Sequence, residues 1–160
     1  MNSKAISRVV LALLLLVLLG GGIWFVRRVP NLSPTTQQLF LGLKSSDMQT
    51  ISAAIQQGAD VNAHDEFGFT PLMQAVMYGA SDAVPLLLDT GADINARTSG
   101  NETALMIAVK FKQEGTIHVL LDHKADINVR AVDGQTALTL ARGYRLPLVA
   151  ARLEKLGAVK

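Results

Sequence analysis

The sequence predicts an all-α repeat solenoid of about four helix-turn-helix units, preceded by one N-terminal transmembrane helix. Two observations lead to this prediction. The loop motif GADVNAH, which starts at Gly58, returns as GADINAR from Gly91 and as KADINVR from Lys124, at a constant interval. An uncharged hydrophobic segment lies ahead of these repeats, at residues 9–26. A constant interval of this size is typical of stacked units that bury their apolar faces against one another.

Composition narrows the classes of protein to consider. Hydrophobic residues make up 49% of the 160 residues, which is enough for a packed core. The chain has no cysteine, so disulfides, thiolate metal sites and a lipoprotein anchor are excluded. Beyond the flanks of the hydrophobic segment, eleven basic residues face thirteen acidic ones. Because nucleic-acid affinity rests on neutralising phosphates, this balance argues against a nucleic-acid partner.

The hydrophobic segment begins at Val9 and ends at Val26. As a helix, its eighteen residues would reach about 27 Å, close to the bilayer core of about 30 Å. Trp24 and Phe25 stand where an interfacial aromatic belt is expected, and Arg27 follows soon after them. The segment is therefore interpreted as a retained membrane anchor, or signal-anchor.

Two alternatives to a retained anchor stay open. One is a cleaved signal peptide, for which Gly20 and Gly22 offer small residues near a peptidase site. The other is a buried core helix. The amino terminus with Lys4 and Arg8 outweighs the two arginines after the segment, which favours an N-terminus inside the cell. The expected location is a bacterial inner membrane with the repeats in the periplasm; after cleavage, the protein would instead be soluble and periplasmic.

The chain is divided into four parts on this basis. Residues 1–8 form a short tail, residues 9–26 the anchor, residues 27–34 a linker and residues 35–160 the repeat domain. The linker is assigned from its small polar residues and its prolines, which disfavour a continuing helix.

Columns of identical residues define the repeat unit. Thr70 is expected to cap the first helix of a unit, with Pro71 at its first position. Gly79 is expected to end that helix, Ser81 to cap the second helix, and Gly91 to end the second helix at positive φ. The columns that recur every 33 residues are Thr70, Thr103 and Thr136; Leu72, Leu105 and Leu138; and Ala75, Ala108 and Ala141.

These residues resemble the ankyrin-repeat family. The TPL triplet after Phe69, the run LLLDTGADINA and the Asp65-x-x-Gly68 turn are similar to its pattern, over residues 35–160. The resemblance implies a stack whose hairpin tips and first helices form a concave, protein-binding face. It also implies a thinner polar network between repeats, because Met73, Met106 and Thr139 replace the histidine of the family, and atypical end repeats, with Gln37 and Gln38 replacing Thr-Pro at the start.

The sequence offers no constellation for catalysis. The histidines at positions 64, 118 and 123 are not spaced as metal ligands on one helical face, and no convergent pair of carboxylates accompanies them. We therefore expect no enzyme activity, no metal, no cofactor and no small-molecule substrate. Asn101 lies in an Asn-x-Thr glycosylation pattern, but it also replaces a turn glycine, since asparagine tolerates positive φ.

The expected function is therefore that of a membrane-tethered module that binds and regulates, inhibits or stabilises a protein partner. An immunity-type inhibitor or a docking factor for a periplasmic enzyme fits this description, and a cytoplasm-facing membrane scaffold is the alternative from another class. An enzyme that uses His64 is a more remote alternative. Aromatic and basic side chains on an exposed face are typical of protein-binding hot spots. The predicted partner-binding residues are Phe67, Phe69, Met77, Tyr78, Arg97, Lys110, Phe111, Arg130 and Tyr144.

The fourth repeat carries a separate charge feature. Its basic residues outnumber Asp133 and Glu154, whereas the earlier repeats are negative overall. One interpretation is a solvated end cap that keeps the solenoid soluble. The other is electrostatic steering of an acidic partner or of an anionic membrane surface. The basic residues are Arg142, Arg145, Arg152, Lys155 and Lys160.

Overall fold

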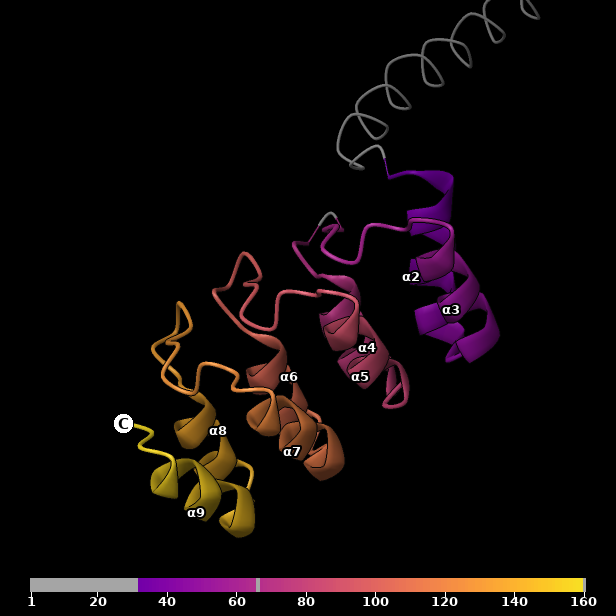
Figure 1. The fold of residues 1–160 in the computed structure, drawn as a ribbon. Coiled ribbons are helices and arrows are strands. Elements are labelled where there is room, and N and C mark those ends of the chain that lie inside the picture. The colour runs from indigo at the N-terminus through magenta and orange to yellow at the C-terminus, as the bar shows by residue number, and fades with distance from the viewer. Residues whose placement is uncertain (1–31, 66, 160) are drawn as a thin grey trace, which may run out of the picture. The chain divides into compact units, whose positions relative to one another are not determined.

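The computed structural model describes residues 32–65 and 67–159. The region Leu32–Lys160 forms one compact unit. Its described residues form helices and turns without a strand, which confirms the all-α repeat class (Figure 1). Four helical hairpins follow one another along the chain: α2 (Pro34–Ser45) with α3 (Met48–Gln56), α4 (Pro71–Tyr78) with α5 (Ala83–Asp89), α6 (Ala104–Lys110) with α7 (Glu114–Asp122), and α8 (Ala137–Gly143) with α9 (Pro147–Lys155).

The predicted membrane segment, residues 9–26, lies outside the described residues. Across residues 32–65 and 67–159, none of the helices combines the length and the hydropathy that a bilayer crossing requires. Helix α2 begins at Pro34, next to Thr35, where the sequence placed the start of the repeat domain.

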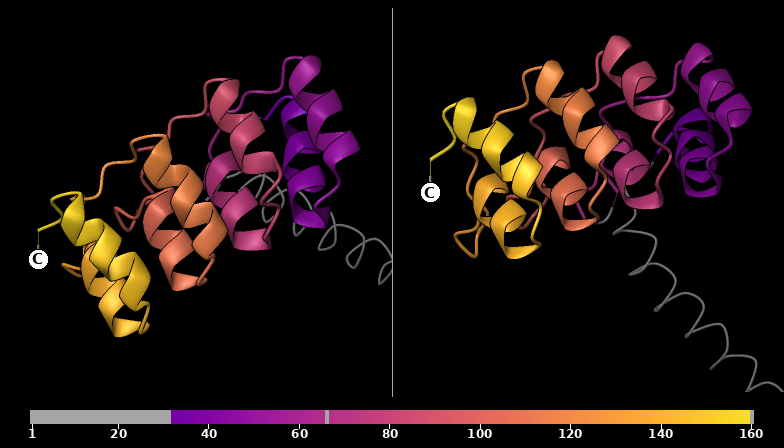
Figure 2. Two further views of the ribbon diagram at one scale, coloured as in Figure 1. Left: turned by 60° about the horizontal axis from the view of Figure 1, so that its bottom comes forward. Right: turned by 90° about the horizontal axis from the view of Figure 1, so that it is seen from below.

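The helices form two layers (Figure 2). The first helices of the hairpins, α2, α4, α6 and α8, pack against one another from repeat to repeat. The second helices, α3, α5, α7 and α9, form the other layer, in which neighbouring helices contact one another less. Because the first-helix layer is the more closely packed, the first helices lie on the inside of the curve of the stack.

The predicted core columns are buried. Leu72 and Leu105 have no exposed surface, and Leu138 exposes 1%. Ala75, together with its equivalents Ala108 and Ala141, is fully buried where the first helices pack together. Small side chains in this column allow neighbouring helices to approach closely, so the repeating pattern specifies both the hairpin and its stacking.

Threonine caps start the first helices, as the sequence predicted. The Thr70 hydroxyl accepts from the Met73 backbone N–H, and Thr103 and Thr136 do the same in their repeats. The first repeat has its own version of this start. Ser33 caps α2 and Pro34 takes the first helical position, so the expectation that this repeat has no such motif is wrong. Gln37, which stands one period before Thr70, lies inside the longer helix α2.

The second helix of the second repeat starts differently from the prediction. Ser81 does not cap it; Asp82 stands at the N-cap position, and its side chain makes no capping hydrogen bond. The Ser81 hydroxyl instead lies 3.3 Å from the hydroxyl of Thr116, one repeat further on. The hydroxyl group that the sequence predicted as a helix cap therefore takes part in a contact between two repeats.

Positive φ angles mark the predicted turns. Gly79 ends α4 at a φ of 74°, and Gly91 follows α5 at 94°. Asn101 takes the place of a turn glycine with a φ of 60°, as expected. Its side-chain amide also donates to the backbone carbonyl of Arg130 at 2.6 Å, which links two hairpin tips.

Asparagine side chains join each loop to the next. The Asn62 side-chain oxygen accepts from the backbone N–H of Asp93 at 2.7 Å, and Asn95 accepts from Asp126 at 2.8 Å. Asn128 repeats the contact with Val159 at 2.9 Å. The described residues therefore contain a polar ladder along the loops, although the histidine positions of the family pattern hold Met73, Met106 and Thr139.

Candidate functional site

Three aromatic side chains form an exposed column along the first helices. Tyr78 is the last residue of α4, whereas Phe111 and Tyr144 are the C-cap residues of α6 and α8. Their exposed fractions are 42%, 54% and 39%. Because they are equivalent residues in stacked repeats, they recur once per repeat, and packed helices lie about 8–10 Å apart. We call Tyr78, Phe111 and Tyr144 the aromatic column; Ser45 takes the same place in the first repeat.

The hairpin tips carry a second exposed aromatic residue, Phe67, with an exposed fraction of 62%. The Asp65 carboxylate holds this tip by accepting from the backbone N–H groups of Phe67 and Phe69, at 2.9 and 2.8 Å. Phe69 is only partly exposed and packs against the core. A folding role therefore accounts for much of the apolar surface of Phe69, but not for that of Phe67.

The predicted site residues fall into two groups at opposite ends of the first helices. The helices start next to the hairpin tips and end at the aromatic column, and the seven residues of α6 rise about 10 Å. The tips hold Phe67, Phe69, Arg97 and Arg130, and the far ends hold Met77, Tyr78, Lys110, Phe111 and Tyr144. A partner that contacts both groups must extend along the full length of the first helices.

Two residues beside the aromatic column are already engaged within the protein. Met77 is partly buried and packs against the core. The Lys110 ammonium forms an ion pair with Glu102, and both side chains are largely covered. The charge of Lys110 is thus mostly offset within its own repeat.

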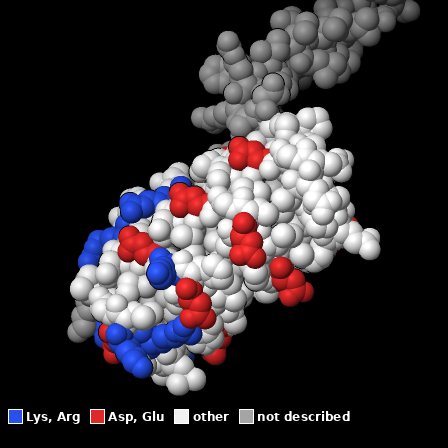
Figure 3. Space-filling view, viewed as in Figure 1, with Lys and Arg blue, Asp and Glu red and all other residues white. Residues whose placement is uncertain are grey.

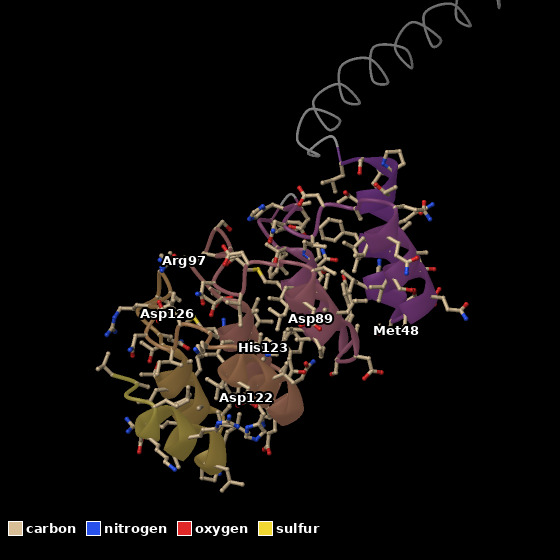
Figure 4. The ribbon with its side chains drawn as sticks, viewed as in Figure 1. Met48, Asp89, Arg97, Asp122, His123 and Asp126 are labelled. Carbon is tan, nitrogen blue, oxygen red and sulfur yellow. The ribbon has the colours of Figure 1, made fainter. Side chains whose placement is uncertain are left out.

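The two predicted arginines lie among the loops (Figure 4 labels Arg97). The Arg97 guanidinium donates to the side-chain oxygen of Asn101 at 3.3 Å, and Arg130 donates to the carbonyl of Gly134 at 2.9 Å. Both arginines are exposed, so their charges are accessible to solvent. A groove of about 500 Å³ beside Arg97 is lined by Asn62, His64, Thr70, Asp93, Asn95 and Ala96.

Charge is distributed unevenly along the stack. Residues 32–96 contain one basic and seven acidic residues, whereas residues 97–160 contain ten basic and six acidic residues. In Figure 3 the lysines and arginines gather over the C-terminal repeats, and the N-terminal part of the visible face shows only acidic groups. The repeats therefore carry an electrostatic gradient along the direction in which they stack.

Sequence reasoning did not single out Lys112, and it placed Arg145 among the basic residues of the fourth repeat, interpreted either as a solvated end cap or as a source of electrostatic steering. Each directly follows a member of the aromatic column and is exposed, and each has a positive φ, 55° for Lys112 and 57° for Arg145. The signal was present in the 33-residue period, because Gly79 is their equivalent. In two repeats a cation therefore stands where the second repeat has a glycine.

The second helices carry a polar cluster of their own. Arg152 of α9 forms an ion pair with Asp122 of α7 at 2.6 Å and also contacts the ring nitrogen Nδ1 of His118. Figure 4 labels Asp122, the last residue of α7. This cluster joins the third and fourth repeats on the outer layer, so it is explained by the packing of the two repeats.

In the described part of the chain, no three histidine, aspartate or glutamate side chains are close enough together to hold a metal ion. In a comparison with protein families, residues 39–131 match the family described as ankyrin repeats in three copies. No curated protein matches the chain.

Proposed function

Because the chain belongs to the ankyrin-repeat family, whose repeats form protein-protein interaction modules, we propose that it binds a protein partner through the aromatic column on its first-helix side. The exposed aromatic column carries this proposal. Tyr78, Phe111 and Tyr144 recur at one place in three consecutive repeats, while the core columns are filled by leucine and alanine. A folding role does not require large aromatic groups at this exposed place.

In the proposed mechanism, the module acts by binding to the surface of its partner. A rigid stack presents the column at fixed intervals, so little conformational entropy is lost on binding. Large aromatics with few rotatable bonds are the residues that most often dominate binding energy. The bound partner is blocked, stabilised or localised without the making or breaking of a covalent bond.

We further propose that residues 9–26 tether the repeats to a bacterial inner membrane and place them in the periplasm. The length of the segment and the flanking charges support this proposal. A tether would restrict the module to partners at or near the membrane. An inhibitor of the immunity type, or a docking factor for a periplasmic enzyme, would act in this way.

Site-specific photo-crosslinking in cells tests the binding proposal. A photoreactive amino acid is placed at Phe111, and in separate variants at Tyr78 and Tyr144. Leu41 is the matched control, because it is an apolar residue of α2 with 65% exposure and lies outside the column. We expect one protein to be crosslinked from all three column positions and not from position 41. Crosslinks that are equally strong at position 41, or absent from the column, would contradict the proposed surface.

A further inference from the structure

We propose that the partner segment bound over the third and fourth repeats is acidic, and that Lys112 and Arg145 bind its carboxylates beside Phe111 and Tyr144. This inference rests on the proposed function, since it names the chemistry of the partner at the same surface. It follows from the left-handed backbone at these two positions, from the lack of an acidic partner within ion-pair distance among the described residues, and from the charge gradient along the stack.

The backbone conformation of Lys112 and Arg145 is unfavourable for residues that carry a Cβ atom. Lys112 and Arg145 occupy the left-handed position after a helix, where the second repeat has Gly79. Their N–H groups bond to the carbonyls of Val109 and Arg142, as that of Gly79 bonds to Val76. The first repeat has the same turn at Ser46, with a φ of 53°, so this position is left-handed in all four repeats and carries a cation in the last two. Glycine adopts this conformation without the steric penalty of a Cβ atom. Non-glycine residues in such conformations concentrate at functional sites.

The helix dipole offers a competing explanation, because a cation near a helix C-terminus is favourable. Lys124 fits that explanation, since it has a φ of 62° after α7 and matches Gly91 in the preceding repeat. It lies at the loop end of the second helix, whereas Lys112 follows the aromatic column. The chain therefore contains its own matched control for charge and backbone conformation.

The cations near the aromatic column differ in whether they form an ion pair within the protein. Lys110 is paired with Glu102, and Arg142 with Glu154. Among residues 32–65 and 67–159, Lys112 and Arg145 have no acidic partner within ion-pair distance. The two cations that directly follow Phe111 and Tyr144 are thus available to an external carboxylate.

The electrostatic gradient along the stack indicates in which direction a charged partner segment lies on it. Residues 32–96 are acidic in net charge, with one basic and seven acidic residues. Residues 97–130 are close to neutral, with five basic and four acidic residues, and residues 131–160 are basic, with five basic and two acidic residues. Complementary potentials steer association and fix the register of a bound chain. An acidic segment therefore binds over Phe111 and Tyr144, whereas Tyr78, which is followed by Gly79, contacts a part of the partner without that charge. Adjacent repeats place the two cations about 8–10 Å apart, close to the rise of about 10.5 Å over seven residues of α-helix.

Fluorescence anisotropy with three synthetic peptides tests the inference on the full chain in non-ionic detergent. The first peptide is helical, with leucine and phenylalanine on one face and glutamates seven residues apart; the other two replace the glutamates with glutamine or lysine. We expect the glutamate peptide to bind at least about tenfold more tightly than the glutamine peptide, and the difference to shrink with added salt.

Glycine variants then test which residues supply the positive charge that binds the glutamate peptide. Lys112→Gly and Arg145→Gly should each weaken binding of the glutamate peptide by about five- to tenfold. Neither should lower the midpoint of thermal unfolding, and a rise of about 2–4 °C is expected because glycine relieves the left-handed backbone. Lys124→Gly should raise the midpoint similarly and leave binding unchanged. An equal loss of binding in Lys124→Gly would overturn the inference, because net charge alone would then explain it.

The remaining outcomes separate this inference from the proposed function. If Phe111→Ala weakens all three peptides equally and the peptides do not differ, the aromatic column stands and the acidic partner is wrong. If the glycine variants weaken binding of the glutamate peptide but Phe111→Ala does not, the cations bind an acidic chain away from the column, and the proposed function fails. Failure of the glutamate peptide to bind overturns the inference. So does its displacement by micelles containing phosphatidylglycerol, since the cations would then serve the membrane surface.

Discussion

The side-chain oxygen of Asn62 accepts a hydrogen bond from the backbone N–H of Asp93, 31 residues further along the chain, at 2.7 Å. Asn95 and Asn128 make the same contact one and two repeats later. Each bond ties the loop of one repeat to that of the next. The loops, and the hairpin tips that follow them, are thereby fixed relative to the helices that carry the aromatic column.

Asn95→Ala should therefore destabilise the stack by about 1 kcal/mol, because the Asp126 N–H loses its acceptor. Urea denaturation followed by circular dichroism measures the change. Asn95→Asp is the matched control, since it keeps an acceptor oxygen in the same place. A variant Asn95→Ala as stable as the unmodified protein would show that water replaces the asparagine at no cost.

Leu105→Ala should destabilise by about 2–5 kcal/mol, because it leaves a cavity at a fully buried position between stacked repeats. Leu148→Ala makes the same chemical change on α9 at 75% exposure and should cost under about 0.5 kcal/mol. Thermal and chemical unfolding of both variants measures the difference. Equal effects of the two substitutions would contradict the alignment of the core columns.

Phe111→Ala should weaken binding of the captured partner by about 2 kcal/mol or more if this residue is the hot spot of the column. Its effect on folding should stay under about 0.5 kcal/mol, since 54% of the side chain is exposed. Calorimetry measures the affinity, and Leu41→Ala, outside the column, should change neither quantity. A large fall in the unfolding midpoint for every aromatic variant would show that the column serves packing.

Arg97 and Arg130 should affect the rate of association more than the lifetime of the complex. Both are exposed among the loops, where charges act mainly through steering. Stopped-flow measurements on Arg97→Gln at increasing ionic strength should show slower association and a weaker salt dependence. An unchanged association rate together with much faster dissociation would instead indicate a direct, desolvated contact.

Acid should remove one contribution to stability at helix α3. A hydrogen bond from the Thr50 hydroxyl, at 2.5 Å, lowers the pKa of Asp47 below its ordinary value of 3.8. Because the folded pKa is the lower one, this contribution is complete above 3.8 and is lost as the pH falls through the folded value. The stability of Asp47→Asn should therefore depend less on pH in this range. Asp89→Asn, at an exposed carboxylate, is the control, and an unchanged pH dependence in Asp47→Asn would contradict the assignment.

The hydrophobic segment should remain attached, with the repeats outside the cytoplasm. A phosphatase reporter that is active only outside the cytoplasm, fused after Lys160, measures the orientation. An inactive reporter on a well-expressed fusion would favour a cytoplasm-facing scaffold. Recovery of a soluble product that begins near Ile23 would instead indicate a cleaved signal peptide.

Much of the fold was predictable from the sequence because the information is local and repeated. Thr70 and Pro71 specify a helix start through their own backbone and side-chain chemistry, and Gly79 specifies its end. Leu72 and its equivalents indicate the buried face because an apolar residue recurs at the same place in each 33-residue unit. The same 33-residue interval places Tyr78, Phe111 and Tyr144 in one column.

Only the tertiary structure decided which side chains are exposed and unpaired, and so available to contact a partner. Ser81 has the chemistry of a helix cap, yet a threonine of the next repeat lies beside its hydroxyl. Phe69 and Phe67 are close in the sequence, but one packs on the core and the other is exposed. Lys110 and Lys112 are both basic, but Glu102 reaches only Lys110. Exposure and ion pairing depend on neighbours that stacking brings together, whereas periodicity and capping depend on residues a few positions apart.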